Sequence, residues 1–165
     1  MIEIPRYVKK VLNTLEESGF EAFVVGGCVR DGIMGKNPSD WDVCTSAVPN
    51  LTQKVFSGIM PTIPTGIKHG TVTVLSDNMP IEVTTFRVDG GYSDSRRPDD
   101  VSFVSDINID LSRRDFTINS MAYNEARGLI GPFGGREDIK KKIIRCVGDP
   151  EKRFSEDALR IIRAL

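Results

Sequence analysis

Cysteine and histidine are scarce in this sequence, and their scarcity excludes several kinds of site. Its 165 residues include three cysteines and one histidine. Cys28, Cys44 and Cys146 form an odd set without the close spacing of a disulfide framework or a zinc site, so we expect reduced, structural thiols. His69 has no second His or Cys partner in the pattern, which favours a structural role over Ser–His–Asp or Cys–His catalysis.

Long apolar runs and an excess of one charge are also absent. No run approaches the roughly 18 residues needed to cross a bilayer, and the first residues lack the apolar core of a signal peptide, so we expect a cytoplasmic protein with no membrane partner. The 22 Lys and Arg residues against 23 Asp and Glu residues give a net charge of −1, which leaves no global positive field for nucleic acid. What is present, 39% hydrophobic and 27% charged residues, is typical of a globular protein with one core.

Hydrophobic periodicity predicts a mixture of helices and strands. Helices are expected over residues 5–18, 28–34, 51–56, 110–120 and 136–142, and from 149 onward. Strands are expected over 20–25, 41–45, 71–75, 81–86, 101–104, 121–123 and 143–147, with a hairpin joining 71–75 to 81–86. The segment 87–100 has no apolar period and predicts a long functional loop. The terminal helix lacks a cap, which indicates a chain cut inside it.

Two carboxylates stand at the entry of the strand expected over 41–45. Asp40 and Asp42 are two residues apart, so the period of a strand points both side chains to one face. Two hard oxygen ligands on one face suit a divalent cation, although a solvated strand end or an Asp-rich turn shows the same pattern. Glu82, inside an apolar strand, needs a cation or donors if it is buried and ionised, or water if its strand lies at an edge.

A glycine turn precedes these carboxylates. Gly26 and Gly27 lie between a strand and a helix, where backbone N–H groups can approach phosphate oxygens, and Arg30 adds a guanidinium. A simple tight turn would explain the two glycines equally well. Carboxylates beside a phosphate-holding turn favour Mg²⁺-dependent phosphoryl or nucleotidyl transfer, and the Gly-x-x-x-x-Gly-Lys-Ser/Thr motif of P-loop NTPases is absent.

Five segments, in order and spanning nearly the whole chain, carry a family resemblance. They are VGGCVRD at 25–31, SDWD at 39–42, IEVTTFR at 81–87, RRDFTINS at 113–120 and EDALR at 156–160. With them the sequence resembles the class II tRNA nucleotidyltransferases, the CCA-adding enzymes and their bacterial poly(A) polymerase relatives.

The resemblance implies a fold and a domain organisation. The expected fold class is α/β of the α+β type, a nucleotidyltransferase head with a mixed, largely antiparallel β-sheet flanked by helices. The catalytic head would cover residues 1–148, and the truncated start of an all-helical neck would cover 149–165. RNA-binding body and tail domains are expected C-terminal to this fragment.

The resemblance also implies roles in nucleotide binding and catalysis. Gly27 and Arg30, with Gly26 in the same turn, would hold the triphosphate of the incoming nucleotide. Asp40 and Asp42 would bind two Mg²⁺ ions as the metal ligands of a catalytic centre.

Three further residues receive roles from the same resemblance. Glu82 would be the third catalytic carboxylate and help to deprotonate the 3′-hydroxyl of the RNA primer. Arg114 and Asp115 would recognise the ribose of the nucleotide. Without the resemblance, these last two would be read as part of a solvated, charged helix start.

The terminal helix resembles a protein template for base choice. Asp157 and Arg160 are expected to be neighbours on one helical face, where an acceptor beside a donor matches the base edge that cytosine and adenine share. Uracil and guanine present the opposite order and would leave buried groups unpaired. Arg163 resembles a further nucleotide-contacting arginine. A surface salt bridge between Asp157 and Arg160 is the alternative.

The reaction implied is template-independent addition of CMP and AMP, from CTP and ATP, to the 3′ end of tRNA with release of pyrophosphate. An A-adding enzyme or a poly(A) polymerase of the same family is the first alternative, and a non-catalytic RNA- or nucleotide-binding module is the second.

Two positions depart from the family pattern. Arg97 stands where many relatives carry His. Gly131 stands where an acid is frequent, and this second departure affects the expected contact between the neck and the head.

Overall fold

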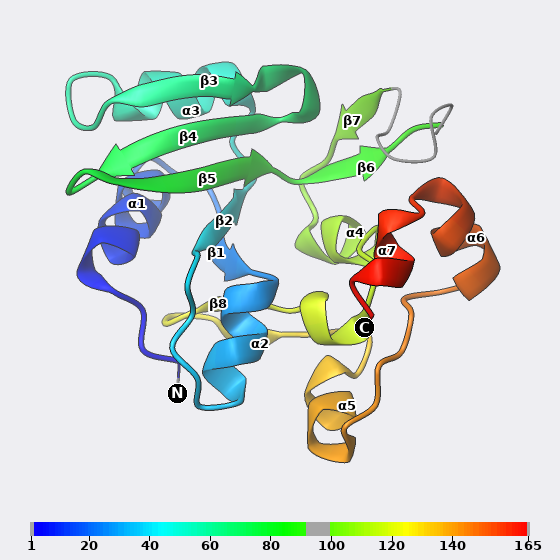
Figure 1. Ribbon diagram of the computed structural model, residues 1–165. Helices are drawn as coiled ribbons and strands as arrows, with labels where there is room; N and C mark the ends of the chain where they lie inside the picture. Colours follow the sequence, from blue (N-terminus) through cyan, green and yellow to red (C-terminus); the bar gives the residue numbers. More distant parts are fainter. Residues whose placement is uncertain (1, 92–99, 165) are drawn as a thin grey trace.

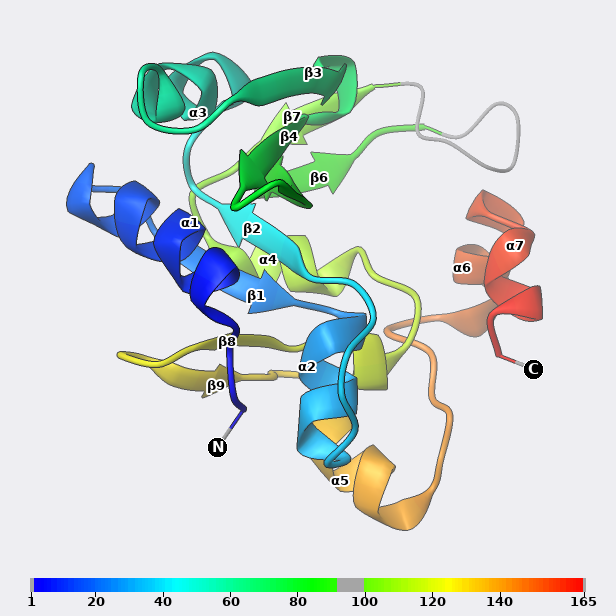
Figure 2. The same ribbon diagram turned by 60° about the vertical axis from the view of Figure 1, so that its left-hand side comes forward.

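The computed structural model describes residues 2–91 and 100–164 as a mixed sheet with helices on both faces (Figures 1 and 2). The helices are α1 (Arg6–Glu17), α2 (Gly27–Ile33), α3 (Pro49–Phe56), α4 (Ile107–Ser112), α5 (Gly135–Lys141), α6 (Pro150–Glu156) and α7 (Leu159–Ile162), with 3-10 turns η1 (Ile67–His69) and η2 (Thr117–Asn119). The strands are β1 (Ala22–Val25), β2 (Asp42–Thr45), β3 (Thr62–Gly66), β4 (Thr71–Ser76), β5 (Met79–Thr85), β6 (Arg87–Asp89), β7 (Val101–Phe103), β8 (Ala122–Asn124) and β9 (Gly128–Ile130). Within these two ranges no helix combines the length and apolarity needed to span a bilayer.

Seven strands form one sheet in the order β3-β4-β5-β2-β1-β8-β9. β2 and β5 are parallel, and the other neighbouring pairs are antiparallel. The apolar side chains of α1 and α3 belong to one core cluster, and those of α4 belong to a second. β6 and β7 form a separate ribbon that follows β5 (Figure 1). The predicted mixed, largely antiparallel sheet flanked by helices is confirmed.

The first helix forms as the sequence predicts. Pro5 is its N-cap, and the apolar residues at helical spacing are all buried against the sheet, namely Val8, Val11, Leu12 and Leu15. The chain leaves the helix through Gly19 at φ +87°, a backbone region that favours glycine. The amphipathic pattern therefore fixes both the extent of α1 and the face that it buries.

The predicted hairpin is confirmed, with a shorter turn than expected. β4 extends to Ser76 and β5 begins at Met79, so only two residues connect the strands. Asp77 and Asn78 both have positive φ, at 53° and 63°. A two-residue turn with this backbone matches the twist of antiparallel strands, and Asp and Asn tolerate it better than most residues.

The helix predicted over 110–120 is wrong in its extent. It begins earlier, at Ile107, because Asp106 caps it, and it ends at Ser112. Phe116 has extended backbone at φ −116°, ψ 147°, and its side chain is buried. Burying this aromatic ring outweighs the helical tendency of the surrounding charged residues.

The strand predicted over 143–147 is also wrong. This part of the chain forms a single isolated bridge, between Phe116 and Cys146. The Thr117 N–H donates to the Arg145 carbonyl at 2.9 Å beside that bridge. The segment around Phe116 offers residues 143–147 too few backbone hydrogen-bond partners for a strand. The contacts with it fix the position of these residues without giving them strand structure.

The terminal helix is two helices, which corrects the prediction of a continuous one from residue 149. Asp157, with φ −146° and ψ 104°, separates α6 from α7. Its Oδ1 accepts the Leu159 N–H at 2.9 Å, a local bond that competes with helix formation. The spacing predicts that Asp157 and Arg160 share one face of a continuous helix. The break at Asp157 shows that they do not.

Three strands, β3, β6 and β9, were not predicted. β6 occupies residues 87–89 of the segment predicted as a loop over 87–100, and residues 92–99 of that segment lie outside the described residues. Arg97 lies outside the described residues. Gly131 has a packing explanation: a Cβ there would lie 3.1 Å from Cγ of the buried Met121. An acid at position 131 would have to displace that side chain.

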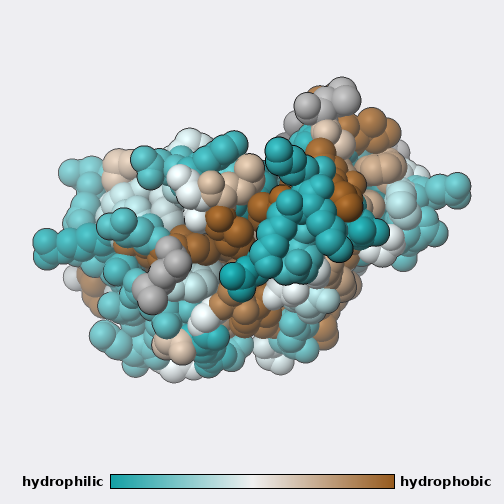
Figure 3. Space-filling view, turned by 90° about the horizontal axis from the view of Figure 1, so that it is seen from below, coloured by the Kyte–Doolittle hydropathy of each residue, from teal (hydrophilic) through white to brown (hydrophobic). Residues whose placement is uncertain are grey.

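The surface is not uniformly polar. Seen from below, hydrophobic residues interrupt the hydrophilic surface (Figure 3). The most exposed large hydrophobic side chain of the described residues is Ile162 of α7, at 65%, and Ile161 beside it is 51% exposed.

All three cysteines are free thiols, as expected. Cys28 and Cys44 are buried, and Cys146 is partly exposed. Burial, opposed by weaker hydrogen bonds, raises the pKa of Cys28 to about 11. Burial likewise raises the pKa of Cys44.

We expect iodoacetamide at pH 8 to alkylate Cys146 first. Partial burial raises the pKa of Cys146 as well, but this residue is partly exposed, whereas Cys28 is buried and has a pKa of about 11. The reagent therefore reaches Cys146 more readily than the other two thiols. Mass spectrometry of peptides from native and urea-unfolded protein measures the three rates. Labelling of Cys28 in the native chain at its unfolded rate would contradict its burial.

Candidate active site

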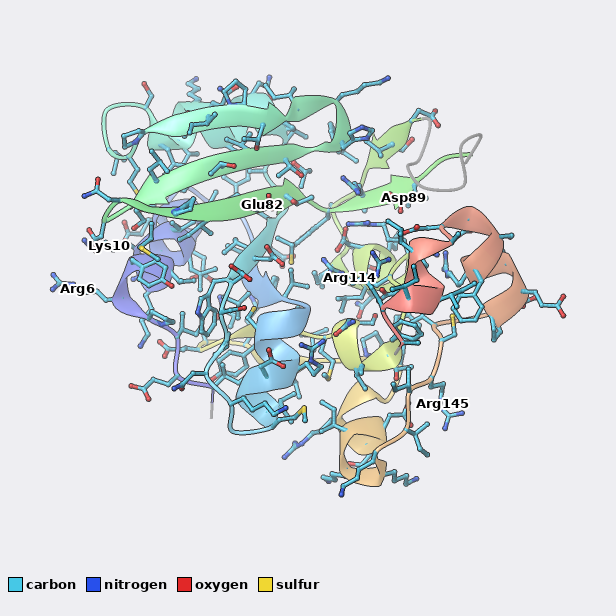
Figure 4. The ribbon with its side chains drawn as sticks, viewed as in Figure 1. Arg6, Lys10, Glu82, Asp89, Arg114 and Arg145 are labelled. Carbon is cyan, nitrogen blue, oxygen red and sulfur yellow. The ribbon has the colours of Figure 1, made fainter. Side chains whose placement is uncertain are left out.

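Two parallel strands at the centre of the sheet bring the candidate carboxylates together. Asp42 begins β2 and lies opposite Glu82 of β5 in the sheet register. Asp40 precedes it by two residues, and all three side chains remain accessible to solvent. Figure 4 shows Glu82 on β5 near the middle of the molecule. A parallel neighbour far away in sequence thus supplies the third carboxylate.

Burial and the neighbouring acids both disfavour the charged form of Asp42. The pKa of Asp42 is raised, first by partial desolvation and next by the charge of Glu82, with Asp40 adding to the rise and Arg114 opposing it. Asp42 is nevertheless solvent-accessible, because it lies on the wall of an open concave site. Clustered acids that face an open space are typical of functional sites.

A cavity of about 400 Å³ lies over the carboxylates. Its lining residues are Tyr7, Ser39, Asp40, Trp41, Asp42, Thr73, Met79, Pro80 and Glu82. The acidic groups share the wall with aromatic and apolar side chains, a combination that suits an organic substrate carrying polar groups.

The carboxylates fit a divalent cation that also takes ligands from its substrate. The described residues hold no set of three or more His, Cys, Asp or Glu side chains ready to bind a metal by themselves. Mg²⁺ does not need one, because it is commonly held by one or two carboxylates, with water and substrate phosphates completing its shell. Asp40 and Asp42 are oxygen donors of that kind, and their repulsion with Glu82 would be relieved by positive charge.

The predicted phosphate-binding turn lies beside Arg114. Gly26 has φ +81° and ψ −129°, a backbone conformation that is strained for any residue with a Cβ. A Cβ at this position would also lie 3.2 Å from Arg114 Nη1. Gly27 begins α2, and a Cβ there would meet only Arg30 Nη2, at 3.7 Å. The backbone conformation therefore requires the first glycine, where a side chain would also press on Arg114, and the second glycine has room beside it.

Arg30 is held in place by two side chains. Its Nε donates to Asp31 Oδ1 at 2.8 Å, and its Nη1 donates to Asn119 Oδ1 at 2.8 Å. The Arg30 side chain is 32% exposed, so the guanidinium keeps an accessible face. A fixed guanidinium with an open side is suited to an anionic group such as phosphate.

Arg114 reaches from the segment after α4 toward the glycine turn (Figure 4). Its Nη2 donates to Asp110 Oδ2 at 3.3 Å. Its Nε is buried and has no hydrogen-bond partner among the described residues. A buried donor without an acceptor is costly, so this side chain is poised for one.

Asp115, Asp157 and Arg163 form a second charged group. Arg163 Nε donates to Asp115 Oδ2 at 2.9 Å, and its Nη2 donates to Asp157 Oδ2 at 3.1 Å. The structure thus joins two predicted nucleotide-binding carboxylates, Asp115 and Asp157, through the predicted Arg163.

Arg160 is oriented differently from the expectation. It is 5% exposed, and its Nη1 donates to Glu156 Oε2 at 2.8 Å and to the Arg153 carbonyl at 3.0 Å. The acceptor and donor that lie side by side in this conformation are therefore Asp157 and Arg163, and Arg160 pairs with the acid one turn before it.

Three polar residues of this region were not identified from sequence: Asp110, Asn119 and Glu156. Asp110 precedes Arg114 by four residues, and Glu156 precedes Arg160 by four, so a search for helical charge pairs could have found both. Asn119 meets Arg30 across 89 positions of sequence, and no local pattern signals that contact.

Comparison with known proteins shows a match to one family and to longer relatives. Residues 22–145 match the family described as the poly A polymerase head domain. The chain is 52% identical over 155 residues to a CCA-adding enzyme of Lactobacillus helveticus, an alignment that covers 94% of this chain and 38% of that protein. The chain thus spans about two fifths of the length of the curated relatives it matches.

Solved structures of the same kind share the fold. The Bacillus stearothermophilus CCA-adding enzyme in complex with CTP aligns with a TM-score of 0.85 and 43% identity, over 98% of this chain and 38% of that one. The Thermotoga maritima CCA-adding enzyme complexed with tRNA aligns with a TM-score of 0.76 and 26% identity, over 99% of this chain and 37% of that one.

Proposed function

Since the chain belongs to the family of the poly A polymerase head domain, we propose that it is the catalytic head of a CCA-adding tRNA nucleotidyltransferase. This head would add CMP and AMP from CTP and ATP to the 3′ end of tRNA, without a nucleic-acid template, and release pyrophosphate. The observation that carries the proposal is the register pairing of Asp42 with Glu82, beside a glycine turn that Arg114 approaches.

The carboxylates would divide the catalytic work. Asp40 and Asp42 would hold divalent cations, which we expect to be Mg²⁺ and which supply charge to acidify the attacking hydroxyl and to neutralise the leaving pyrophosphate. Glu82 would accept the proton of the primer 3′-hydroxyl. The 3′-oxygen then bonds to the α-phosphorus, and the bond from this phosphorus to the oxygen bridging the β-phosphate breaks.

The glycine turn and the arginines would bind the nucleotide. Gly26 and Gly27 allow close backbone approach to the triphosphate, and Arg30 offers its accessible guanidinium face. Arg114, whose Nε has no partner within residues 2–91 and 100–164, and Asp115 would hold the ribose.

Base choice would depend on an acceptor beside a donor. Asp157 and Arg163 provide that pair in the observed conformation, and Arg160 lies fixed next to them by Glu156. We propose that Asp157, Arg160 and Arg163 together face the edge that cytosine and adenine share.

The proposed domain organisation is that of a larger enzyme. We propose that residues 1–148 form the head and that 149–165 begin a helical neck, because the apolar side chains of α7 are exposed, with Ile162 at 65%. The relatives are longer than this chain, and we propose that RNA-binding body and tail domains follow. A cytoplasmic location fits substrates such as tRNA and nucleoside triphosphates.

A nucleotide panel tests the function. The protein is incubated with Mg²⁺ and radiolabelled tRNA lacking its 3′ CCA, with each of the four ribonucleoside triphosphates singly and then with CTP and ATP together. We expect C residues from CTP, a complete CCA end from the mixture, and addition from UTP or GTP at least about 100-fold slower. Products are resolved on sequencing gels.

Two results would redirect the proposal. Addition of long tails from ATP alone would favour the poly(A) polymerase alternative. The matching family is named after the head domain of that enzyme. Incorporation of UTP or GTP at the rate of CTP would exclude base selection by Asp157 and its neighbouring arginines.

A further inference from the structure

A cluster of buried charges contacts Arg114 through Asp110. None of its members has a role in the proposed nucleotide transfer. The cluster consists of Arg87 and Asp89 from β6, Asp110 from α4, and Arg113 after that helix. Asp110 is fully buried, at 0% exposure. Figure 4 shows Asp89 and Arg114 in neighbouring parts of the molecule. Buried charges persist only when they are paired, so each contact in this cluster is under strong geometric constraint.

Asp110 accepts hydrogen bonds from three groups. Its Oδ1 accepts the Arg87 backbone N–H at 3.2 Å and Arg113 Nε at 3.0 Å. Its Oδ2 accepts Arg114 Nη2 at 3.3 Å. Burial alone would raise the pKa of Asp110, but the charges of Arg113 and Arg114 outweigh it and keep the pKa below its ordinary value. The carboxylate is thus ionised and fixed at both oxygens.

Arg114 is held at one end and open at the other. Asp110 holds Nη2, whereas Nη1 points to the space beside Gly26 and Nε has no partner among the residues that the structure describes. The side chain is 20% exposed, enough for a ligand atom to reach it. A guanidinium fixed before its ligand arrives loses little conformational freedom on binding.

We propose that Asp110 is a positioning residue that holds the Arg114 guanidinium against the Gly26 turn before the nucleotide binds. The inference rests on the proposed function, because it gives Arg114 a nucleotide as its ligand. It adds a residue outside the carboxylate centre whose exchange would act on nucleotide binding only through Arg114.

A double-mutant cycle measures this coupling. CTP affinity is determined by isothermal titration calorimetry with Mg²⁺ for the wild type, Asp110→Asn, Arg114→Ala and the double variant. We expect about 30-fold weaker binding for Arg114→Ala and about tenfold for Asp110→Asn. The double variant should bind like Arg114→Ala, because Asp110 acts through that side chain.

Asp89→Asn is the matched control. Asp89 is another acid of the cluster, which pairs with Arg87 and Arg113 at 3.1 and 3.4 Å. We expect its CTP affinity to stay within about threefold of the wild type. Equal losses in Asp89→Asn and Asp110→Asn, or additive losses in the double variant, would show a merely structural cluster and overturn the proposal.

A second measurement uses protein in which Asp110 is unchanged, so it does not depend on whether an Asp110 variant folds. The Arg114 Nε–H resonance, assigned by its disappearance in Arg114→Lys, reports the order of this side chain by NMR relaxation. We expect a rigid group in nucleotide-free protein, and a mobile one would overturn the proposal. Failure of the wild type to bind CTP, with Arg114 rigid, would instead count against the proposed function.

Discussion

Replacing Asp42 by asparagine is expected to reduce nucleotide addition about 1000-fold or more while CTP binding persists. Asparagine keeps the size of the side chain and removes the charge that a cation needs. Charge stabilisation by a bound cation contributes several kcal/mol to such transition states, and each 1.36 kcal/mol is tenfold in rate. Single-turnover incorporation of CMP measures the rate, and calorimetry measures CTP affinity.

The same substitution is expected to stabilise the folded protein when no divalent cation is present. Desolvation first, and then Glu82, raise the pKa of Asp42 in the folded state. A carboxylate with a raised folded pKa binds its proton more tightly in the folded than in the unfolded chain, so its ionisation lowers stability as the pH rises through that pKa. The substituted asparagine carries no charge, so the melting temperature should rise at pH 7 and match the wild type at pH 3.

Asp77→Asn is the control for both effects. Asp77 lies in the β4–β5 turn at φ 53°, where asparagine is equally tolerated, and it makes an exposed pair with Lys10. We expect neither rate nor stability to change beyond about 0.5 kcal/mol. Full incorporation activity in Asp42→Asn would remove Asp42 from catalysis, and a wild type that binds CTP but adds nothing would favour a non-catalytic binding module.

The carboxylate site shows which part of the fold could be predicted from the sequence. The spacing of Asp40 and Asp42 and the apolar flanks of Glu82 identify three acids, because strand periodicity is local. The parallel pairing of β2 with β5 is not local. It follows from how α3, β3 and β4 are accommodated between the two strands in the chain, and no pattern in either strand reports it.

The errors fall where side chains outside the local segment decide the backbone. Phe116 leaves the predicted helix because its ring is buried and its backbone meets Cys146. Asp157 interrupts the last helix because its carboxylate bonds to Leu159 and Arg163. Asp110 looks like an ordinary polar helix residue in the sequence, and only the fold reveals that it is fully buried.

Gly135→Ala is expected to destabilise the protein by about 2–3 kcal/mol and to weaken CTP binding. A Cβ at this first position of α5 would lie 2.1 Å from the Thr117 carbonyl oxygen and 3.1 Å from Met121 Sδ. The first of these neighbours is backbone, so α5 and η2 must separate. η2 carries Asn119, which holds Arg30, and the displacement therefore reaches the proposed triphosphate site. Urea unfolding and calorimetry with CTP measure the two effects.

Gly32→Ala separates a backbone clash from the general effect of adding a methyl group. A Cβ at Gly32 would lie 2.8 and 3.1 Å from the two γ-carbons of Ile2, a buried residue of the segment before α1. That segment would have to shift, and the cost is partly offset because alanine favours α2 by about 0.5–1 kcal/mol. We expect a net loss of about 1 kcal/mol and unchanged CTP affinity. If Gly135→Ala proved equally mild, the contact of α5 with η2 would be adaptable, and Arg30 would owe its position to Asp31 rather than to the packing beneath Asn119.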